Sequence, residues 1–430
     1  MMIDLPLGGS RPIPKHWKLY SVDEIKSPEP YSCVAGPFGS NISSKYFVDQ
    51  GVPVIRGKNL TDDLTRFVPE NFVFVTEQRA RQKYVAQHVQ AGDLVFTCWG
   101  TIGQVGFIPE DGPYPEYIIS NKQLKLRVNP EIANPLFVYY YLASREGAEH
   151  IRNRATGSAV PGINLGILKS LKVALPSLPT QQKIVAILSA YDDLIDNNNR
   201  RIALLEEAIH RLYREWFVHL HFPGHEHTPV VAGVPEGWEK RPIKDTFEIT
   251  GGGTPRRKEE RYWADGTINW FTPSDLTKFR SMFRDSSSEK ISEAGFSNSS
   301  ARMFPPYSVM MTSRATIGVI AINTVEATTN QGFITCIPNE RVPLYFLYCW
   351  LTANVTVFEN YATGATFKEI SKGVFKKIPV LLPSQSLLKD FHEIVEPMAK
   401  QILNLQRQNQ YLAEARDSLL PRLMNGSLPV

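Results

Sequence analysis

The chain contains two copies of one long unit, and this repeat constrains the fold more than any other feature. Short motifs of the first half return in the second half in the same order: PKHW at 14–17 and PEGW at 235–238, TIG at 101–103 and 316–318, ATG at 155–157 and 362–364, and LPS at 175–177 and 382–384. The offset between matching motifs shortens gradually along the chain, which indicates small insertions and deletions in loops. Because this period is far longer than that of a solenoid repeat, each copy should be a domain with its own core.

The first part of each copy has the pattern of a compact, mostly β domain. Short β-rich runs at 51–56, 72–75 and 93–97 are separated by Gly and Pro. The aromatic stretches Pro135–Leu142 and Pro343–Leu351 each begin with proline, which is favoured at a helix start, and predict a helix packed on the sheet. The expected fold class is therefore α+β in each copy.

The second part of each copy carries a heptad pattern that predicts a long coiled-coil helix. One apolar series runs through Leu188, Ile195, Ile202, Ile209 and Trp216 and is answered by Tyr191, Asn198, Leu205 and Leu212. The later copy repeats it at the same phase, with Val395, Ile402, Asn409, Arg416 and Leu423 against Phe391, Met398, Leu405, Leu412 and Leu419. We expect the two helices to pair antiparallel, related by a pseudo-twofold, and to separate the two domains.

An antiparallel pair with flush ends places Leu188 opposite Leu419 and also Asn198 opposite Asn409. A buried pair of Asn side chains lowers stability but fixes register, so we predict that these two face one another. The alternative is that both are solvated at a loose point of the seam. Pro397 removes one helical hydrogen bond, and a bend is expected near Glu396.

Composition excludes some classes of protein. The chain of 430 residues is 43% hydrophobic and 11% aromatic, which argues against disorder, and it has no apolar run long enough for a membrane span. The start lacks the order of a secretion signal, and the four cysteines, Cys33, Cys98, Cys336 and Cys349, have no CxxC spacing. These features predict a reduced, cytoplasmic protein. A net charge of +4 permits an anionic partner without requiring one.

Two motifs could carry chemistry, and neither is convincing. Phe304–Tyr307 (FPPY) is close to the (Asp/Asn)-Pro-Pro-(Tyr/Phe) motif of adenine methyltransferases, but Phe304 cannot hold an amino nitrogen, and a turn before the strand Tyr307–Thr312 is expected instead. His219, His221, His225 and His227 cluster in a polar segment without cysteines, which favours an exposed linker over a metal site. We therefore predict no catalytic residues, no metal site and no cofactor in this chain.

Basic and amide residues in the loops of both copies are candidates for contact with DNA. Arg and Lys suit guanine edges and phosphates, and Asn and Gln suit adenine edges. The candidates are Arg56, Lys58, Asn59, Lys122 and Gln123 in the first copy and Arg256, Arg257, Lys258, Arg314, Asn330 and Gln331 in the second. Surface loops often carry such residues without binding anything, so each one is only a candidate.

Further motifs make the chain resemble the specificity subunits of type I restriction-modification systems over nearly its whole length. They are Ala155–Ser158 with Asn164–Leu165, Val173–Pro179 (VALPSLP), Gln181–Ile184 (QQKI) opening a long helix, Trp216–Val218 (WFV) followed by Phe222–His225 (FPGH), and Ala415–Met424 (ARDSLLPRLM). The second copy departs from the pattern with Ser386–Lys389 (SLLK) where the QQK-like opening is expected, which puts the start of that helix in doubt.

The resemblance implies a non-catalytic subunit that reads the two halves of a split, asymmetric sequence in double-stranded DNA. Its parts would be a target recognition domain at 1–178, a conserved spacer helix at 179–219, a linker at 220–236, a second recognition domain at 237–383 and a second spacer helix at 384–426. Two modification methyltransferase subunits would dock on the helices, and restriction subunits would join the full complex. The methyl donor, ATP and magnesium would then belong to those partners.

Two other functions fit the repeat. A two-headed scaffold that binds proteins or carbohydrates could have the same architecture without any role with DNA. A stand-alone methyltransferase would have to transfer methyl groups without a partner. DNA binding weakens steeply with salt because phosphate contacts release counterions, whereas an apolar protein interface responds weakly, so the salt dependence separates the first two readings.

Overall fold

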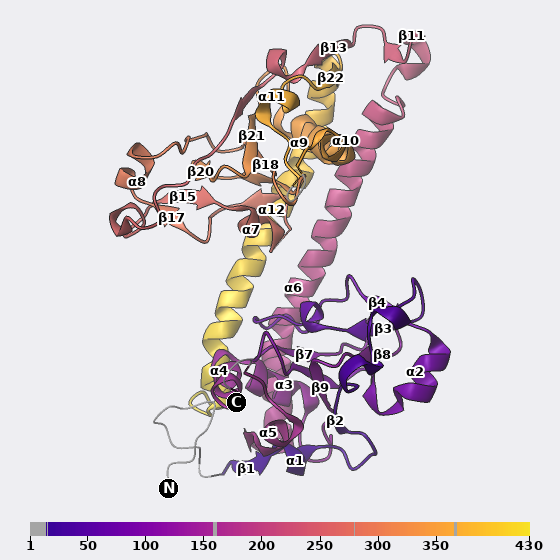
Figure 1. The fold of residues 1–430 in the computed structure, drawn as a ribbon, viewed down its shortest axis with the longest axis vertical. Coiled ribbons are helices and arrows are strands. Elements are labelled where there is room, and N and C mark those ends of the chain that lie inside the picture. The colour runs from indigo at the N-terminus through magenta and orange to yellow at the C-terminus, as the bar shows by residue number, and fades with distance from the viewer. Residues whose placement is uncertain (1–13, 15, 158–160, 279, 365–367) are drawn as a thin grey trace. The chain divides into compact units, whose positions relative to one another are not determined.

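The computed structural model describes residues 14, 16–157, 161–278, 280–364 and 368–430 (Figure 1). Ser158 and the first residues of the predicted 1–178 domain lie outside this range. The chain forms two compact units: unit 1 is Met1–Asp196 with Asn409–Val430, and unit 2 is Asn197–Gln408. The division falls within the two longest helices, so each unit holds one domain and a part of both helices.

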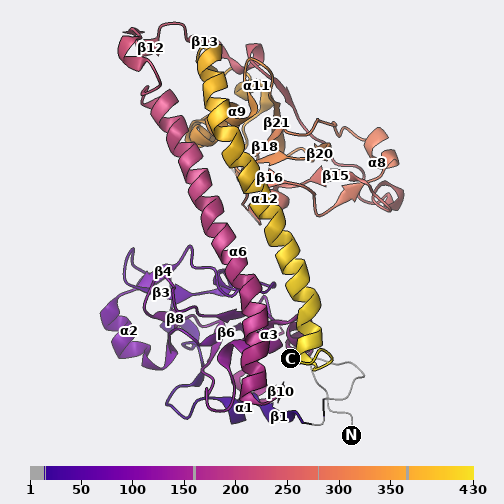
Figure 2. The same cartoon turned by 180° about the vertical axis from the view of Figure 1, so that it is seen from behind.

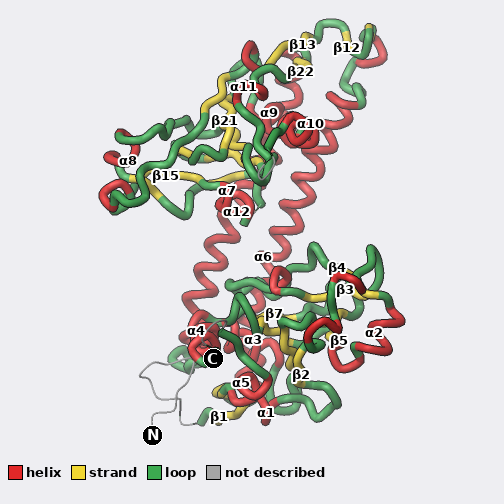
Figure 3. The backbone as a smooth tube through the Cα atoms, viewed as in Figure 1, coloured by secondary structure: helices red, strands yellow, loops and turns green. Residues whose placement is uncertain are grey.

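Unit 1 is a mixed domain in which short strands form two four-stranded sheets and one pair (Figure 3). One sheet has the order β2 (Cys33–Ala35), β9 (Gln123–Leu126), β6 (Leu94–Thr97), β7 (Val105–Phe107). The other has the order β4 (Val73–Val75), β3 (Val52–Ile55), β8 (Tyr117–Ile119), β5 (His88–Val89). The pair is β1 (Lys18–Ser21) and β10 (Lys172–Leu175), which brings the two ends of the domain together.

Unit 2 has the same arrangement with small additions. Its larger sheet has the order β14 (Glu248–Thr250), β21 (Phe333–Ile337), β18 (Val309–Thr312), β19 (Ile320–Asn323), β16 (Phe283–Arg284). The smaller sheet has the order β17 (Lys290–Ile291), β15 (Ile268–Phe271), β20 (Ala327–Thr329). The strands that close the unit are β13 (Glu239–Pro242) and β22 (Pro379–Leu382), and a hairpin of β11 (Val230–Val231) and β12 (Val234–Pro235) precedes them.

The strand pairings show that the repeat extends to topology and register. In unit 1, β6 pairs antiparallel with β7 and β9, and in unit 2, β18 pairs antiparallel with β19 and β21. The second sheet described in each unit contains one parallel pair, β3 with β8 in unit 1 and β15 with β20 in unit 2. Val95 faces Lys125 across one sheet as Met310 faces Thr335 across the other. The predicted α+β fold with two homologous domains is confirmed.

Helices cover these sheets in the same chain order in both units. Unit 1 has α1 (Val22–Ile25), α2 (Glu77–Lys83), α3 (Pro135–Ala143), α4 (Arg145–Asn153), α5 (Leu165–Ser170) and the start of α6 (Leu178–Tyr213). Unit 2 has α7 (Pro273–Thr277), α8 (Glu293–Ser297), α9 (Leu344–Ala353), α10 (Val355–Tyr361), α11 (Lys372–Phe375) and most of α12 (Gln385–Met424). As predicted, the aromatic helices α3 and α9 are buried, and a π-helical turn at Arg214–Val218 follows α6.

The openings of α6 and α12 show why the two copies differ at the QQK motif. The Gln181 side chain accepts a hydrogen bond from the Asn134 backbone amide at 2.8 Å, and its own amide donates to the Pro176 carbonyl at 2.9 Å. Asn134 in turn caps α3 by accepting from Leu136 N. In unit 2 the matching position is Leu388, which is fully buried in the apolar core. The helix α6 begins at Leu178 and has a polar contact at this position, whereas α12 begins at Gln385 and has an apolar one.

Within each unit the two long helices pack antiparallel (Figure 2). In unit 1, Leu188 shares a core with Leu420 and Leu423, and Arg416 contacts Asp192. In unit 2, the rings of Trp216 and Phe391 lie 6.0 Å apart. Asn198 belongs to unit 2 and Asn409 to unit 1, so their pairing stays a prediction. The bend expected near Glu396 also stays a prediction, although α12 is one helix through Pro397.

Candidate nucleic-acid interface

Unit 1 has a hollow of about 780 Å³ at one edge of its two sheets, built by three loops. One loop follows β3, the second joins β6 to β7 and the third joins β8 to β9. Backbone hydrogen bonds tie the loops together, from Ser120 N to Ile55 O at 3.0 Å and from Cys98 N to Lys122 O at 2.9 Å. The hollow is lined by Phe47, Arg56, Gly57, Lys58, Leu60, Thr97, Trp99, Gly100, Thr101, Gln104, Ser120, Asn121, Lys122 and Gln123.

Four of the five candidates predicted in the first copy meet in this hollow. Arg56, Lys58, Lys122 and Gln123 come from two different loops, and the fold places them around one space. Burial lowers the pKa of Lys58, and the nearby charge of Arg56 lowers it further. Two cations held this closely favour an anionic ligand, because a negative charge between them relieves their repulsion.

Two residues that line the hollow also have buried polar atoms without a hydrogen-bond partner among the described residues. Gln123 is fully buried, and its Nε2 has no hydrogen-bond partner among the described residues, while its Oε1 accepts from Ser120. The Nε of Arg56 is likewise buried and unpaired among those residues. Unsatisfied buried donors are costly in a folded protein, so these two side chains stand out among those that line the hollow.

The fifth candidate, Asn59, does not belong to the surface, and we withdraw it from the set of DNA-contacting residues. Its side chain is fully buried, where its amide donates to the carbonyls of Val68 and Glu70 at 3.1 and 2.8 Å. Its Oδ1 accepts from Arg56 N at 3.0 Å. Asn59 therefore fixes the loop that carries Arg56 and Lys58, and every polar atom of its side chain is already engaged.

Unit 2 has a smaller hollow of about 460 Å³ at the equivalent place. The same backbone bonds frame it, from Asn330 N to Phe271 O at 3.0 Å and from Ser313 N to Gly332 O at 2.8 Å. The loop after β15 is fixed as in unit 1, here by Asp275, whose carboxylate accepts from Thr272 N at 2.7 Å. The hollow is lined by Pro273, Ser274, Thr277, Arg314, Ala315, Thr316, Asn330, Gln331 and Gly332.

The shared frame aligns the two hollows residue by residue and shows that their linings differ. Trp99 in unit 1 corresponds to Arg314 in unit 2, two residues before the TIG motif of each copy. Lys122 corresponds to Gly332, as their matching backbone bonds require. The glycine of each TIG motif has a positive φ, +99° at Gly103 and +83° at Gly318, so both loops make the same tight turn. One backbone therefore presents two different sets of side chains.

Three candidates of the second copy meet in the hollow and three do not. Arg314, Asn330 and Gln331 line it. Arg257 instead forms an ion pair with Glu289 at 2.5 Å and stacks over the Trp263 ring at 4.0 Å. Arg256 and Lys258 are exposed on the same loop. For these three residues, contact with DNA stays a prediction without support from the hollow.

Several residues that line the hollows of unit 1 are not among the candidates predicted from the sequence. Trp99 is 47% exposed at the mouth of the first hollow, although large aromatic side chains are usually buried. Aligning the two TIG motifs would have paired Trp99 with Arg314 and marked it. A second hollow of about 430 Å³ beside the first is lined by Lys45, Arg79 and Lys83, and it shares Phe47 with the first. These basic residues lie on a helix and a turn that the sequence analysis did not single out.

The other motifs take part in local structure. His219 and His221 both direct Nδ1 to the carboxylate of Glu215, at 3.1 and 3.0 Å. Among the described residues, no group of three or more His, Cys, Asp or Glu side chains is arranged to hold a metal ion. Phe304 is buried and bridges to Ala327, and the turn at Pro305–Tyr307 leads into β18 as expected. No helix in the described part of the chain is long and apolar enough to cross a membrane.

Comparison with known proteins gives this arrangement a context. A family model described as the type I restriction modification DNA specificity domain matches residues 39–207 and 235–411, once in each copy of the repeat. The type I restriction enzyme MjaIX specificity subunit of Methanocaldococcus jannaschii is 24% identical, over 97% of this chain and 95% of that protein. The HindI specificity subunit of Haemophilus influenzae is also 24% identical, over 79% of this chain and 87% of that protein.

A solved structure has the same fold. The crystal structure of the type I restriction-modification system S subunit from M. genitalium covers 98% of this chain and 99% of its own length, with a TM-score of 0.56 and 15% sequence identity. The two family matches include both hollows and the larger part of both long helices. The chain belongs to the family of type I restriction-modification DNA specificity domains.

Proposed function

We propose that this chain recognises DNA for a type I restriction-modification complex, with each unit reading one half of a split target through its hollow. The observation that carries the proposal is the repeated hollow, which has one backbone frame and two different linings. A frame that is kept while its side chains change is what two readers of different base sequences need. The chain itself is the non-catalytic member of such a complex.

The linings support two unlike half-sites. In unit 1 the hollow combines three cationic side chains, Arg56, Lys58 and Lys122, with Trp99 and Gln123. In unit 2 it combines one cation, Arg314, with the amides Asn330 and Gln331. Cations hold phosphates and guanine, whereas amides pair with adenine. The target should therefore be asymmetric.

Exposed apolar residues on the helices support docking of two copies of one partner. Ile187 on α6 and Ile394 on α12 occupy equivalent heptad positions and are 37% and 46% exposed. Leu204 and Tyr411 form a second equivalent pair, 66% and 67% exposed. Apolar residues repeated on the outer faces of two helices fit an interface that occurs twice. We assign these positions to two modification methyltransferase subunits.

The remaining chemistry would reside in the partners. The methyl donor would be bound by the modification subunits, and ATP and magnesium by restriction subunits of the full complex. Because the substrate is cellular DNA, the complex would act in the cytoplasm. In this chain the residues that line the hollows then serve recognition alone.

Selection of randomised double-stranded DNA by the full chain, purified with its methyltransferase partner, tests the proposal. We expect one motif with two defined parts and an undefined gap, and binding that weakens steeply with salt, with a log–log slope near −0.9 per phosphate neutralised. A two-headed protein or carbohydrate scaffold would enrich no motif and would respond weakly to salt. The partner without this chain is the control, and it should enrich no split motif.

A further inference from the structure

We infer that one equivalent position in the two hollows, Trp99 in unit 1 and Arg314 in unit 2, determines which base is read at one place in each half-site. The inference rests on the proposed function and adds the chemistry of the bases. Arg314 reads a guanine in the half-site of unit 2. Trp99 contacts the methyl group of a thymine in the half-site of unit 1.

The backbone holds both residues in the same way. Trp99 forms an isolated bridge with Gly162, which also bridges Thr156, and Arg314 forms one with Glu369, which also bridges Thr363. The residue that follows has a positive φ in both units, +90° at Gly100 and +62° at Ala315. The loop thus turns away at once after the side chain, which leaves that side chain at the mouth of the hollow. Such a fixed backbone suits a residue that must reach a defined point.

The residue that bridges to this position differs between the two units together with the side chain at the position itself. A Cβ atom on Gly162 would lie 3.3 Å from two ring atoms of Trp99, so the absence of a side chain there lets the indole lie flat against the backbone. In unit 2 the partner is Glu369, whose carboxylate lies 3.7 Å from the Nε of Arg314. The pairs Trp with Gly and Arg with Glu are therefore two alternative ways of orienting a side chain on one frame.

The orientation of Arg314 suits a base edge. The carboxylate of Glu369 lies on the Nε side of the guanidinium, which leaves the two terminal amino groups for a bidentate contact, and guanine offers two acceptors at O6 and N7. Asn330 and Gln331 line the same hollow and can pair with neighbouring bases. A phosphate contact would need only a point charge. It would not require the carboxylate beside the guanidinium or the fixed loop conformation.

Trp99 offers different chemistry at the same point. Its ring is half exposed and, together with the partly exposed Phe47, provides apolar surface in a hollow that also holds polar and cationic side chains. The thymine methyl is the apolar feature of the major groove, and contact with it excludes cytosine, which lacks the methyl. The two half-sites should therefore differ at this position, with G in one and T in the other.

Selection of randomised double-stranded DNA with the wild-type complex and four variants tests the assignment. Arg314→Ala should reduce the preference for G at one position of one half-site by roughly 10- to 100-fold and leave the other half-site unchanged. Arg314→Lys, which keeps the charge without the planar fork, should reduce the same preference less than Arg314→Ala does, because lysine can also reach the guanine acceptors. Trp99→Ala should reduce the preference for T by roughly tenfold in the other half-site. Arg341→Ala, with an ion pair to Glu239 at 2.7 Å, removes an equal charge elsewhere in unit 2 and should change no preference.

Each other outcome contradicts part of the account. An unchanged motif for Arg314→Ala, with binding to all sequences uniformly weaker, would make Arg314 a phosphate contact and overturn the assignment. Loss of base preference in both half-sites from a single substitution would indicate a folding defect and not the loss of one base contact. Arg314→Lys is the milder change and distinguishes these two causes. A wild-type complex that enriches no motif overturns the proposed function and this assignment with it.

Discussion

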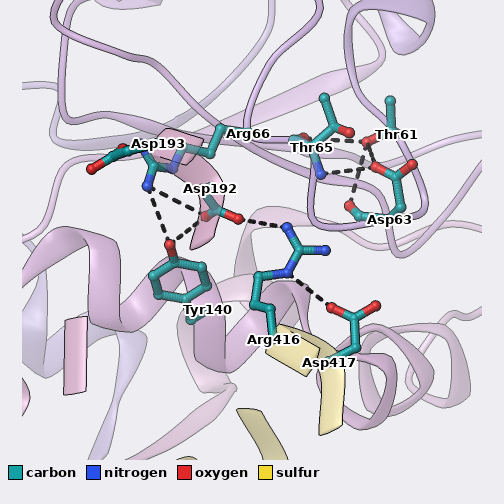
Figure 4. Close-up of polar contacts among 9 residues, drawn as sticks. All are labelled: Thr61, Asp63, Thr65, Arg66, Tyr140, Asp192, Asp193, Arg416 and Asp417. Carbon is teal, nitrogen blue, oxygen red and sulfur yellow. Dashed lines mark hydrogen bonds and ion pairs between the residues drawn. The ribbon is translucent and has the colours of Figure 1, made fainter. Parts of the chain in front are cut away.

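The place where the first recognition domain meets the long helices is ionic in unit 1, whereas the equivalent place in unit 2 is apolar. In unit 1, Asp192 on α6 is buried among Arg66 from the domain, Tyr140 on α3 and Arg416 on α12 (Figure 4). In unit 2 the equivalent positions are Ala399, Met282, Tyr348 and Ile209, and all four belong to one apolar core. The same packing problem has two solutions in one chain.

The ionic solution depends on every member. Asp192 is 5% exposed and Arg416 is 6% exposed, and Arg416 Nη1 lies 2.5 Å from one carboxylate oxygen of Asp192. The other oxygen accepts from the Tyr140 hydroxyl and lies 3.3 Å from Arg66. Burial raises the pKa of Tyr140, and the charge of Asp192 raises it further, so the phenol stays protonated as a donor. We call these four residues the ionic node.

The apolar packing in unit 2 does not depend on every residue being present, because the contributions of dispersion and desolvation are roughly additive. A buried ion pair adds little net stability over apolar residues of similar volume, yet removal of one partner leaves a buried charge without compensation. We therefore predict that a single substitution in the ionic node strongly lowers the stability of unit 1. Simultaneous replacement of all its charged residues should lower that stability much less. The following predictions test that contrast, from the largest effect to the smallest.

Removal of the central carboxylate should have the largest effect. Asp192→Ala removes the buried carboxylate between Arg66 and Arg416 and leaves them only the more exposed carboxylates of Asp193 and Asp417, so it should lower the free energy of unfolding of unit 1 by up to about 3–5 kcal/mol. Denaturant unfolding of the full chain, followed with probes in each unit, measures this. The exposed carboxylate Glu289, in its surface pair with Arg257, is the control, and Glu289→Ala should lower the free energy of unfolding by less than about 1 kcal/mol. Equal effects of the two substitutions would show that the node is not brittle.

Another buried cation, outside the ionic node, should make the stability of unit 1 depend on pH in a way that the stability of unit 2 does not. Lys125 is 2% exposed in β9, its ammonium donates to the His88 carbonyl at 2.6 Å, and burial lowers its pKa to about 8. The equivalent residue in unit 2 is the neutral Thr335. Below about pH 8 both folded and unfolded states carry the charge, and the penalty of burying it is constant. Between that pH and about 10.4, the usual lysine pKa, the unfolded state binds more protons, so the stability of unit 1 should rise with pH.

The size of this rise should be on the order of 1–3 kcal/mol for Lys125. Lys125→Met should remove it, so the difference in unfolding free energy between wild type and variant should change over this pH range for unit 1 and stay constant for unit 2. Thr335→Val is the matched change in unit 2 and should alter no pH dependence. A constant difference for Lys125→Met would mean that Lys125 is not titrating in the folded state.

Concerted replacement should have the smallest effect. The triple variant Arg66→Met, Asp192→Ala and Arg416→Ile copies the side chains of unit 2 into the node and leaves Tyr140 opposite an apolar surface, as Tyr348 is in unit 2. We expect a free energy of unfolding within about 2 kcal/mol of wild type, because no buried charge remains. A triple variant as unstable as Asp192→Ala would contradict the equivalence of the two solutions.

The sequence predicted the repeat, the α+β class and the paired helices, because motif order and heptad spacing are local patterns. It could not predict the ionic node. Arg416 occupies a core position of the heptad and resembles a polar interruption, and its partners Arg66 and Tyr140 lie far away in the chain. Asp192 gives no sign in the sequence that it is buried. Only the fold brings these residues together.

The residues of the candidate interface likewise include some that the sequence can indicate and others that it cannot. Residue type and loop position are visible in sequence, and the candidates chosen in this way that line a hollow are Arg56, Lys58, Lys122, Gln123, Arg314, Asn330 and Gln331. Asn59 was misjudged because a loop amide that binds DNA and one that binds its own backbone look alike in sequence. Trp99 was missed because aromatic residues are assigned to the core unless a structure shows them exposed.

The central claim is that this chain selects the DNA sequence for a methyltransferase partner, and methylome sequencing tests it most directly. Cells expressing this chain with its modification methyltransferase partner would be compared with cells expressing the methyltransferase alone. The account predicts methyl-adenine at one split, asymmetric motif that appears only when this chain is present. An active methyltransferase that gives no new methylation in the presence of this chain, or the same motif without it, would contradict the account.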